Sequence, residues 1–268
     1  MKFSNYLKAD FYKLKKSNWL WLMPIIIFGI MLLLYVLFLV LVRLYMTGDV
    51  DVDPTNTIPL DGEILGKYLM FTAPSESNLP IILMVATAIY VCTEFKSGMT
   101  KIRISRGANR VNMFFSKFIV MVGVAVVYTV GAYILSTLLS AIFFGIKGFS
   151  AQDVGYFFRS IGITLYVNIS IVSIYMMVAY LIRNLGGAIG ACIGVYILGG
   201  VISSAGALFS EGIIRDILNC IPSSLLTLAG STGELSAANT IEVILVPFAF
   251  ILICNIVSVF TFRDRDVK

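Results

Sequence analysis

The chain of 268 residues contains no histidine, so the commonest general base and zinc ligand is missing. Charged residues are also scarce, at 13% of the chain against 59% apolar residues. A soluble globule of this composition could not cover its surface with polar groups, so lipid is the expected solvent for most of the chain. Of only four cysteines, three lie in apolar runs, which leaves no disulfide framework or metal cluster to expect.

A phosphate-binding loop is missing as well. The nearest string, residues 62–68, has three residues between its glycines and no Ser or Thr after Lys67, so it departs from the nucleotide-binding pattern at two points. Without histidine or a buried carboxylate pair, an intramembrane enzyme is also disfavoured. We therefore expect no catalytic residue, no metal and no cofactor in this chain.

Apolar runs of about 20 residues, the length that crosses roughly 30 Å of hydrocarbon, recur along the whole sequence. They predict a single all-α transmembrane domain over residues 1–268, with spans at 19–42, 79–93, 114–146, 157–182, 186–209 and 241–262. The third run is longer than the bilayer is thick, so one of its ends should project beyond the hydrocarbon.

The basic residues orient these spans, because lysines and arginines of short loops are retained in the cytoplasm. With the N-terminus inside, 15 of the 20 basic residues fall on the cytoplasmic side, while 11 of the 15 acids fall outside. We therefore expect both termini in the cytoplasm, a coupling loop at 94–113 inside, and loops at 44–78 and 210–240 outside. The net charge of +5 then reflects basic residues that orient the spans, and it does not indicate nucleic-acid binding.

Three connecting segments have a recognisable pattern. Residues 1–17 place apolar side chains at helical spacing among lysines, which predicts an amphipathic helix in the inner headgroup layer; a merely basic flank is the alternative. The stretch 94–117 is basic and interrupted by glycines, which fits either a short helix along the membrane or a solvated loop. The segment 211–240 is apolar enough to form short helices that dip into the outer leaflet, whereas 44–78 is expected to be a loose cap.

Two patterns within the spans concern helix packing or transport. Thr164, Asn168 and Tyr175 share one face, which could line a substrate path or make hydrogen bonds between helices. Gly186, Gly190 and Gly194 form a strip that permits close helix approach, either within the chain or in a dimer.

Taken in order, these features resemble the permease subunits of type-2 ATP-binding-cassette (ABC) transporters, a bacterial exporter family. The family typically carries Glu, a Gly-Thr pair, a Leu-Ser-like pair, a Ser-Arg pair and Lys after the second span. The matching residues are Glu94, Ser97-Gly98-Met99-Thr100, Ile104-Ser105, Asn109-Arg110 and Lys117. Met99 interrupts the Gly-Thr pair, and Asn109 stands where Ser is usual.

The resemblance implies six transmembrane helices, an N-terminal elbow helix, a cytoplasmic coupling helix between spans 2 and 3, and short outer re-entrant helices between spans 5 and 6. ATP and Mg²⁺ would be bound by separate ABC ATPase subunits, and a second permease chain, identical or paralogous, would complete the transporter in the bacterial cytoplasmic membrane. The residues implied in coupling to the ATPase are Glu94, Gly98, Thr100, Arg103, Arg106, Arg110 and Lys117.

The expected function is therefore ATP-driven export. The length of the chain and the substrates usual in the family favour an antimicrobial peptide or another amphipathic compound as the substrate. A stand-alone channel or an ion-coupled carrier is the alternative. Carriers usually bury ionisable groups in their spans, and the centres of the six apolar runs hold none.

Overall fold

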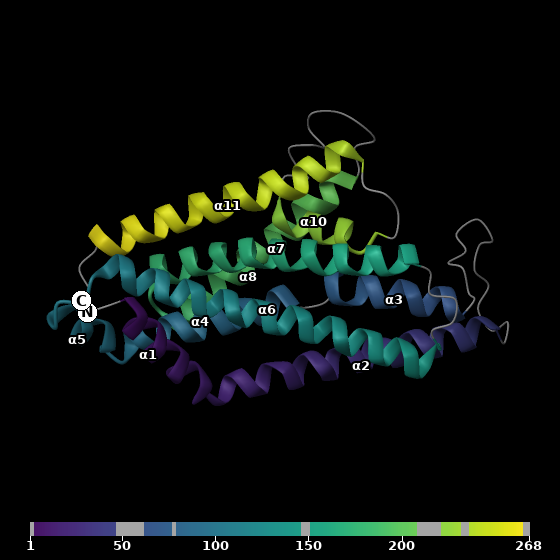
Figure 1. Ribbon diagram of the computed structural model, residues 1–268, viewed down its shortest axis with the longest axis horizontal. Helices are drawn as coiled ribbons and strands as arrows, with labels where there is room; N and C mark the ends of the chain where they lie inside the picture. Colours follow the sequence, from purple (N-terminus) through teal and green to yellow (C-terminus); the bar gives the residue numbers. More distant parts are fainter. Residues whose placement is uncertain are drawn as a thin grey trace.

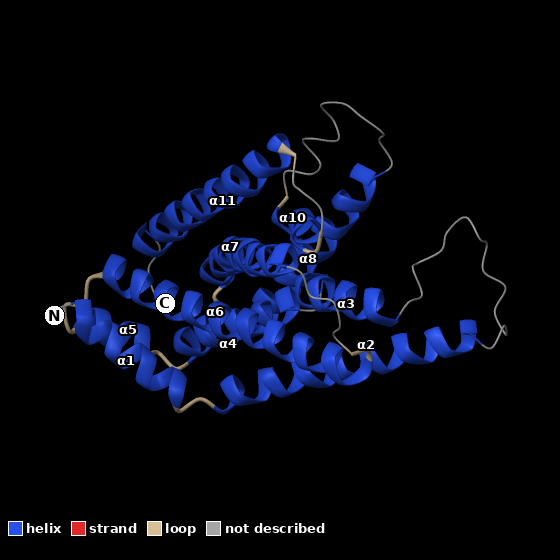
Figure 2. Ribbon diagram, turned by 45° about the vertical axis from the view of Figure 1, so that its right-hand side comes forward, coloured by secondary structure: helices blue, strands red, loops and turns tan. Residues whose placement is uncertain are grey.

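The computed structural model describes residues 3–46, 62–76, 79–145, 151–207, 221–231 and 236–264. Within these ranges the chain forms helices and short connections but no strand (Figure 2). Six stretches are long and apolar enough to cross a membrane: Leu22–Val40, Gly66–Lys96 (apart from the undescribed residues 77–78), Arg110–Phe143, Ala151–Ile182, Leu185–Ser204 and Asn239–Arg263. The all-α membrane fold with six candidate spans is confirmed.

The helices follow one another along the chain with short connections between several of them (Figure 1). Their bounds are α1 Phe3–Lys15, α2 Asn18–Met46, α3 Gly62–Glu76, α4 Leu79–Lys96, α5 Met99–Ser105, α6 Arg110–Phe143, α7 Ala151–Ile182, α8 Leu185–Ala207, α10 Pro222–Ala229 and α11 Ala237–Asp264.

The second candidate span begins earlier than the predicted 79–93. Residues 62–76, expected within the loose outer loop 44–78, form α3, and its Leu69, Met70 and Phe71 are all buried. Lys67 lowers the mean hydropathy of this stretch, so the sequence did not predict a helix here. Its packing partner is α6, whose Ser140 donates a hydrogen bond to the carbonyl oxygen of Gly66 at 2.8 Å. The rest of that predicted loop, 47–61, lies outside the described residues.

Helix α6 is longer than a bilayer crossing requires, as its sequence predicted. Its 34 residues span about 51 Å at 1.5 Å per residue, against roughly 30 Å of hydrocarbon. Its start is defined locally, because the Asn109 side chain accepts a hydrogen bond from the backbone N–H of Val111 at 3.0 Å. The first turns of α6 can therefore lie outside the hydrocarbon.

Helix α4 is the centre of the bundle. It packs against α2, α6, α7 and α8, and it belongs to the candidate span Gly66–Lys96, the most buried of the six at 71%. The outer helices α2, α8 and α11 are only 22%, 17% and 28% buried, so most of their apolar surface faces away from the chain. Figure 1 shows α11 running along α7 on one side of the bundle and α2 along α6 on the other.

Helices α1 and α5, the start of α6 and the finish of α11 meet at one end of the molecule, which we call the α5 end (Figure 1). Arg110 in the first turn of α6 donates to the carbonyl oxygens of Phe262 at 3.1 Å and Arg263 at 2.8 Å in the last turn of α11. Arg183, just after α7, donates to the carbonyl oxygen of Thr261 at 3.3 Å. The first and last described helices therefore reach the same end of the bundle.

The predicted short helices between the fifth and sixth spans are described in part. Helix α10 buries Leu225, Leu226 and Ala229 against the bundle, where it packs on α7, α3 and α8. Residues 208–220 and 232–235 of the same segment lie outside the described residues.

Candidate functional site

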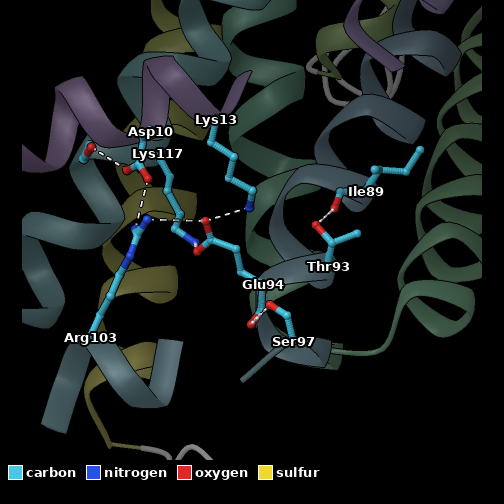
Figure 3. A network of polar contacts seen from close by, with 9 residues as sticks. Asp10, Lys13, Ile89, Thr93, Glu94, Ser97, Arg103 and Lys117 are labelled. Atoms are coloured by element: carbon cyan, nitrogen blue, oxygen red, sulfur yellow. Dashed lines mark hydrogen bonds and ion pairs between the residues drawn. The ribbon is translucent and has the colours of Figure 1, made fainter. Parts of the chain in front are cut away.

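Five ionisable side chains gather at the α5 end, in what we call the charged cluster: Asp10, Lys13, Glu94, Arg103 and Lys117 (Figure 3). They come from four helices, α1, α4, α5 and α6. In their usual ionised states, three cations face two anions, so the charged cluster carries one surplus positive charge.

Glu94 is the hub of the charged cluster. One carboxylate oxygen accepts a hydrogen bond from Lys13 Nζ at 2.7 Å, and the other accepts from Lys117 Nζ. The guanidinium of Arg103 lies 4.0 Å from the first oxygen. Because the Glu94 side chain is 0% exposed and that of Lys117 is 2% exposed, each depends on the other to offset the cost of leaving water.

Asp10 makes the second half of the charged cluster. Its side chain is fully buried, one oxygen accepts from Arg103 Nη1 at 3.0 Å, and the other accepts from Ser116 Oγ at 2.7 Å. Asp10 thus fixes α1 against both α5 and α6. Burial by itself would lower the pKa of the Arg103 guanidinium, but the Glu94 and Asp10 carboxylates outweigh it, so that pKa is raised and Arg103 stays charged.

The charged cluster changes how the predicted coupling residues are interpreted. Glu94 and Lys117 were expected at the ends of a loop, but they lie inside α4 and α6 and are buried. They face the interior of the chain, where they hold its own helices together. The structure also adds Asp10 and Lys13, which the sequence reading did not select as site residues. A signal for Asp10 existed: Tyr6, Asp10 and Leu14 are four residues apart, and all three are buried on one face of α1.

Helix α5 is separated from its neighbours by two glycines. Gly98 (φ +67°) precedes it and Gly107 (φ +78°) follows it. Both backbones lie in the left-handed region that favours glycine, so the chain can leave α4, turn into a seven-residue helix and turn again into α6. The predicted short helix within 94–113 is therefore present.

The two faces of α5 differ. Thr100 is buried and Arg103 reaches the charged cluster, whereas Met99 and Ile102 are 45% and 52% exposed and Arg106 is exposed. Of the predicted coupling set, Arg106 is thus open to a partner. Arg110 instead stabilises the carboxyl end of α11, as described above.

The predicted polar face of the fourth span is buried. Thr164 hydrogen-bonds with the Tyr133 hydroxyl at 2.8 Å, and the Asn168 amide donates to Thr129 Oγ1 at 3.1 Å, so both residues connect α7 to α6. Tyr175 is buried beside α8 and α10 and lines a cavity of about 40 Å³. These contacts agree with the hydrogen-bonding alternative, and a substrate path along this face stays a prediction.

The glycine strip of α8 faces away from the described part of the chain. Gly186 and Gly190 are exposed and Gly194 is partly exposed. A Cβ atom added at any of the three would meet nothing within 4 Å. Close packing of this strip against a described helix of the same chain is therefore not observed.

The fold and the charged cluster define a multi-pass helical membrane protein whose short helix at one end is fixed to several spans by buried ion pairs. The family model described as ABC-2 family transporter protein matches residues 6–203, which run from α1 into α8 and include the charged cluster. The chain belongs to this family and is a membrane subunit of an ABC-type transporter. Membership implies association with ABC ATPase components, and such subunits are typically not catalytic themselves. None of the curated proteins matches the chain in sequence.

Proposed function

We propose that the chain is the permease of a bacterial ABC exporter, in which a separate ATPase subunit binds ATP and Mg²⁺ and drives transport through α5. The observation that carries this proposal is the pair of exposed apolar side chains, Met99 and Ile102, on the same short helix whose Arg103 reaches the charged cluster. In this proposal α5 is the coupling helix and α1 is the elbow helix.

The outer face of α5 suits docking to a soluble protein. Met99 and Ile102 expose apolar surface beside the exposed basic residues Lys101 and Arg106. Apolar anchors within a polar rim are the usual composition of a protein interface. With seven residues, α5 is about 10 Å long, which is short enough to fit into a groove on a soluble partner.

The inner face of α5 supports transmission of movement. Arg103 joins α5 to Asp10 of α1, and Glu94 of α4 joins Lys13 of α1 and Lys117 of α6. Because the two carboxylates, Asp10 and Glu94, are fully buried, breaking their ion pairs is costly and the four helices tend to move together. A push on α5 would therefore reach two spans and the elbow helix at once.

The orientation in this proposal places the α5 end in the cytoplasm of the cell, with both termini on that side. Its support is the excess of lysine and arginine in the segments that meet there. An ATPase is cytoplasmic, so the basic end and the docking end have to coincide.

A second permease chain is proposed to pack on the glycine strip of α8. Gly186, Gly190 and Gly194 are not covered by the part of the chain that the structure describes, and 17% burial of the α8 span leaves a wide face for a partner. Small residues allow two membrane helices to approach closely, which favours their association. An amphipathic substrate, such as an antimicrobial peptide, could then reach the paired chains from the lipid.

The test is co-expression with the ATPase encoded beside this chain, followed by purification on a tag carried by the ATPase. Ile102→Asp should reduce co-purified permease by about tenfold or more and abolish permease-stimulated ATP hydrolysis, because an apolar anchor of this size contributes roughly 1.5–3 kcal/mol when buried. Asn5→Asp adds the same charge at an exposed site on α1 and should leave both unchanged. If wild type and Ile102→Asp co-purify equally, α5 is not the docking helix.

A further inference from the structure

A cavity of about 450 Å³ opens between α1 and α4 at the α5 end. Helix α1 and the residues that follow it contribute Lys13, Lys16 and Ser17, and α4 contributes Ile89, Tyr90 and Thr93. In Figure 3, Lys13 lies between the Glu94 carboxylate and the side of α4 that carries Ile89 and Thr93. The cavity therefore adjoins the charged cluster but is separate from the docking face of α5.

The charge around the cavity favours an anion. The charged cluster, which has one cation more than it has anions, reaches the cavity wall through Lys13, whose ammonium is paired with Glu94 and also lies 5.2 Å from the centre of the Tyr90 ring. Lys16 adds a second positive charge at the rim and is exposed. The residues lining the cavity include no acid.

The other wall of the cavity is apolar. Ile89 and the buried ring of Tyr90 face it, and the Thr93 hydroxyl donates to the Ile89 carbonyl at 2.6 Å, which leaves its methyl group available. A small inorganic anion would leave this surface without a partner. A ligand with a negative head and a hydrocarbon tail would cover both parts.

The depth of the cavity matches a lipid headgroup. Lys16 and Ser17 connect α1 to α2, and the four residues of α2 that precede Leu22, the first residue of the first candidate span, correspond to about 6 Å along the helix. The headgroup region adds roughly 5–8 Å to each side of the hydrocarbon. Lys16 and Ser17 thus lie at the level where lipid phosphates lie.

We propose that this cavity binds one anionic phospholipid, with its phosphate at Lys16 and Ser17 and the upper part of an acyl chain against Ile89 and Tyr90. The lipid fills the space between the elbow helix and α4. It is a ligand of the permease alone, so the proposal is independent of the ATPase and of export.

The experiment follows the thermal unfolding of the purified chain in a neutral detergent during titration with phosphatidylglycerol, phosphatidylcholine or inorganic phosphate. A ligand that binds only the folded protein raises the unfolding temperature, and the stabilisation grows with the logarithm of the ligand concentration once that concentration exceeds Kd. Phosphatidylglycerol should raise the unfolding temperature with this logarithmic dependence, whereas the zwitterionic lipid and inorganic phosphate should have little effect. An equal effect of inorganic phosphate would identify an ion site, and an equal effect of phosphatidylcholine would identify unspecific lipid contact; either result overturns the proposal.

Two variants and one matched control locate the effect. Lys16→Gln should weaken the apparent affinity for phosphatidylglycerol about fivefold, the factor that corresponds to about 1 kcal/mol for one lysine at an anionic surface. Lys15→Gln removes the same charge from a neighbouring exposed position that does not line the cavity, and should bind as the wild type does. Thr93→Phe should place a ring across the apolar wall of the cavity and reduce the stabilisation by phosphatidylglycerol. Equal losses in Lys15→Gln and Lys16→Gln would show general attraction to a basic helix and refute the site, whether or not Thr93→Phe folds.

Discussion

Replacing Glu94 by Gln keeps the size of the side chain and removes the charge on which the charged cluster is centred. Two cations then lose their principal carboxylate, Lys13 at 2.7 Å and the closely paired Lys117. They do not lose equally: the Lys13 side chain is 32% exposed and can turn to water, whereas that of Lys117 is 2% exposed. The cost of the substitution therefore falls mainly on Lys117.

The magnitude follows from this burial. An exposed ion pair contributes about 0–1 kcal/mol, but removing one partner of a buried pair costs about 3–5 kcal/mol because the other charge is left without compensation. We expect Glu94→Gln to lower the free energy of unfolding by an amount in this second range. Removing the stranded charge as well, in Glu94→Gln with Lys117→Met, should recover most of the loss, since two uncharged side chains of similar volume carry no such penalty.

The assay is equilibrium unfolding of the purified chain in mixed micelles, read by circular dichroism, for the wild type, Glu94→Gln, Lys117→Met and the double variant. Asp153→Asn is the matched control: its ion pair with Lys67 is 3.1 Å long, but the side chains are 22% and 27% exposed, so about 1 kcal/mol or less is expected. A loss no larger in Glu94→Gln than in Asp153→Asn would refute the argument. So would a double variant that is less stable than Glu94→Gln, because the stranded charge would then not be the cause.

Two further predictions test the dimer and the orientation. Gly190→Leu should leave the unfolding of the single chain unchanged, since a Cβ there meets nothing within 4 Å, yet it should reduce the dimer fraction in light scattering. A normal dimer fraction in this variant would contradict the α8 contact. Gly187→Leu is the comparison: its Cβ would lie 2.9 Å from Ile182 Cγ2, so it should destabilise the chain itself. A membrane-impermeant thiol reagent should label Cys220 in intact cells, because the three other cysteines are buried and residues 210–240 are predicted outside. Cys220→Ser should abolish the signal. Labelling only after permeabilisation would invert the proposed orientation.

The charged cluster illustrates what lay beyond the sequence. Glu94, Arg103 and Lys117 were selected through the family resemblance, but their meeting in one cluster followed only from the packing of α4, α5 and α6 against α1. Asp10 was missed although it lies on the buried face of α1. The sequence around Asp10 does not reveal its partner, because Arg103 is far away along the chain and close only in space.

The sequence by itself determined the features that depend on the solvent and on local backbone geometry. A run of apolar residues requires lipid wherever it lies, so the six candidate spans could be counted from hydropathy. Gly98 and Gly107 similarly marked the ends of α5, because left-handed backbone conformations favour glycine irrespective of the surroundings.

Only the tertiary structure decided which surfaces meet. It placed α3 inside the bundle against α6, directed Arg110 to the end of α11, and left the glycine strip of α8 uncovered. The physical reason is the same in each case: hydrogen bonds, ion pairs and close packing act over a few ångströms, between residues whose separation along the chain does not reveal their separation in space.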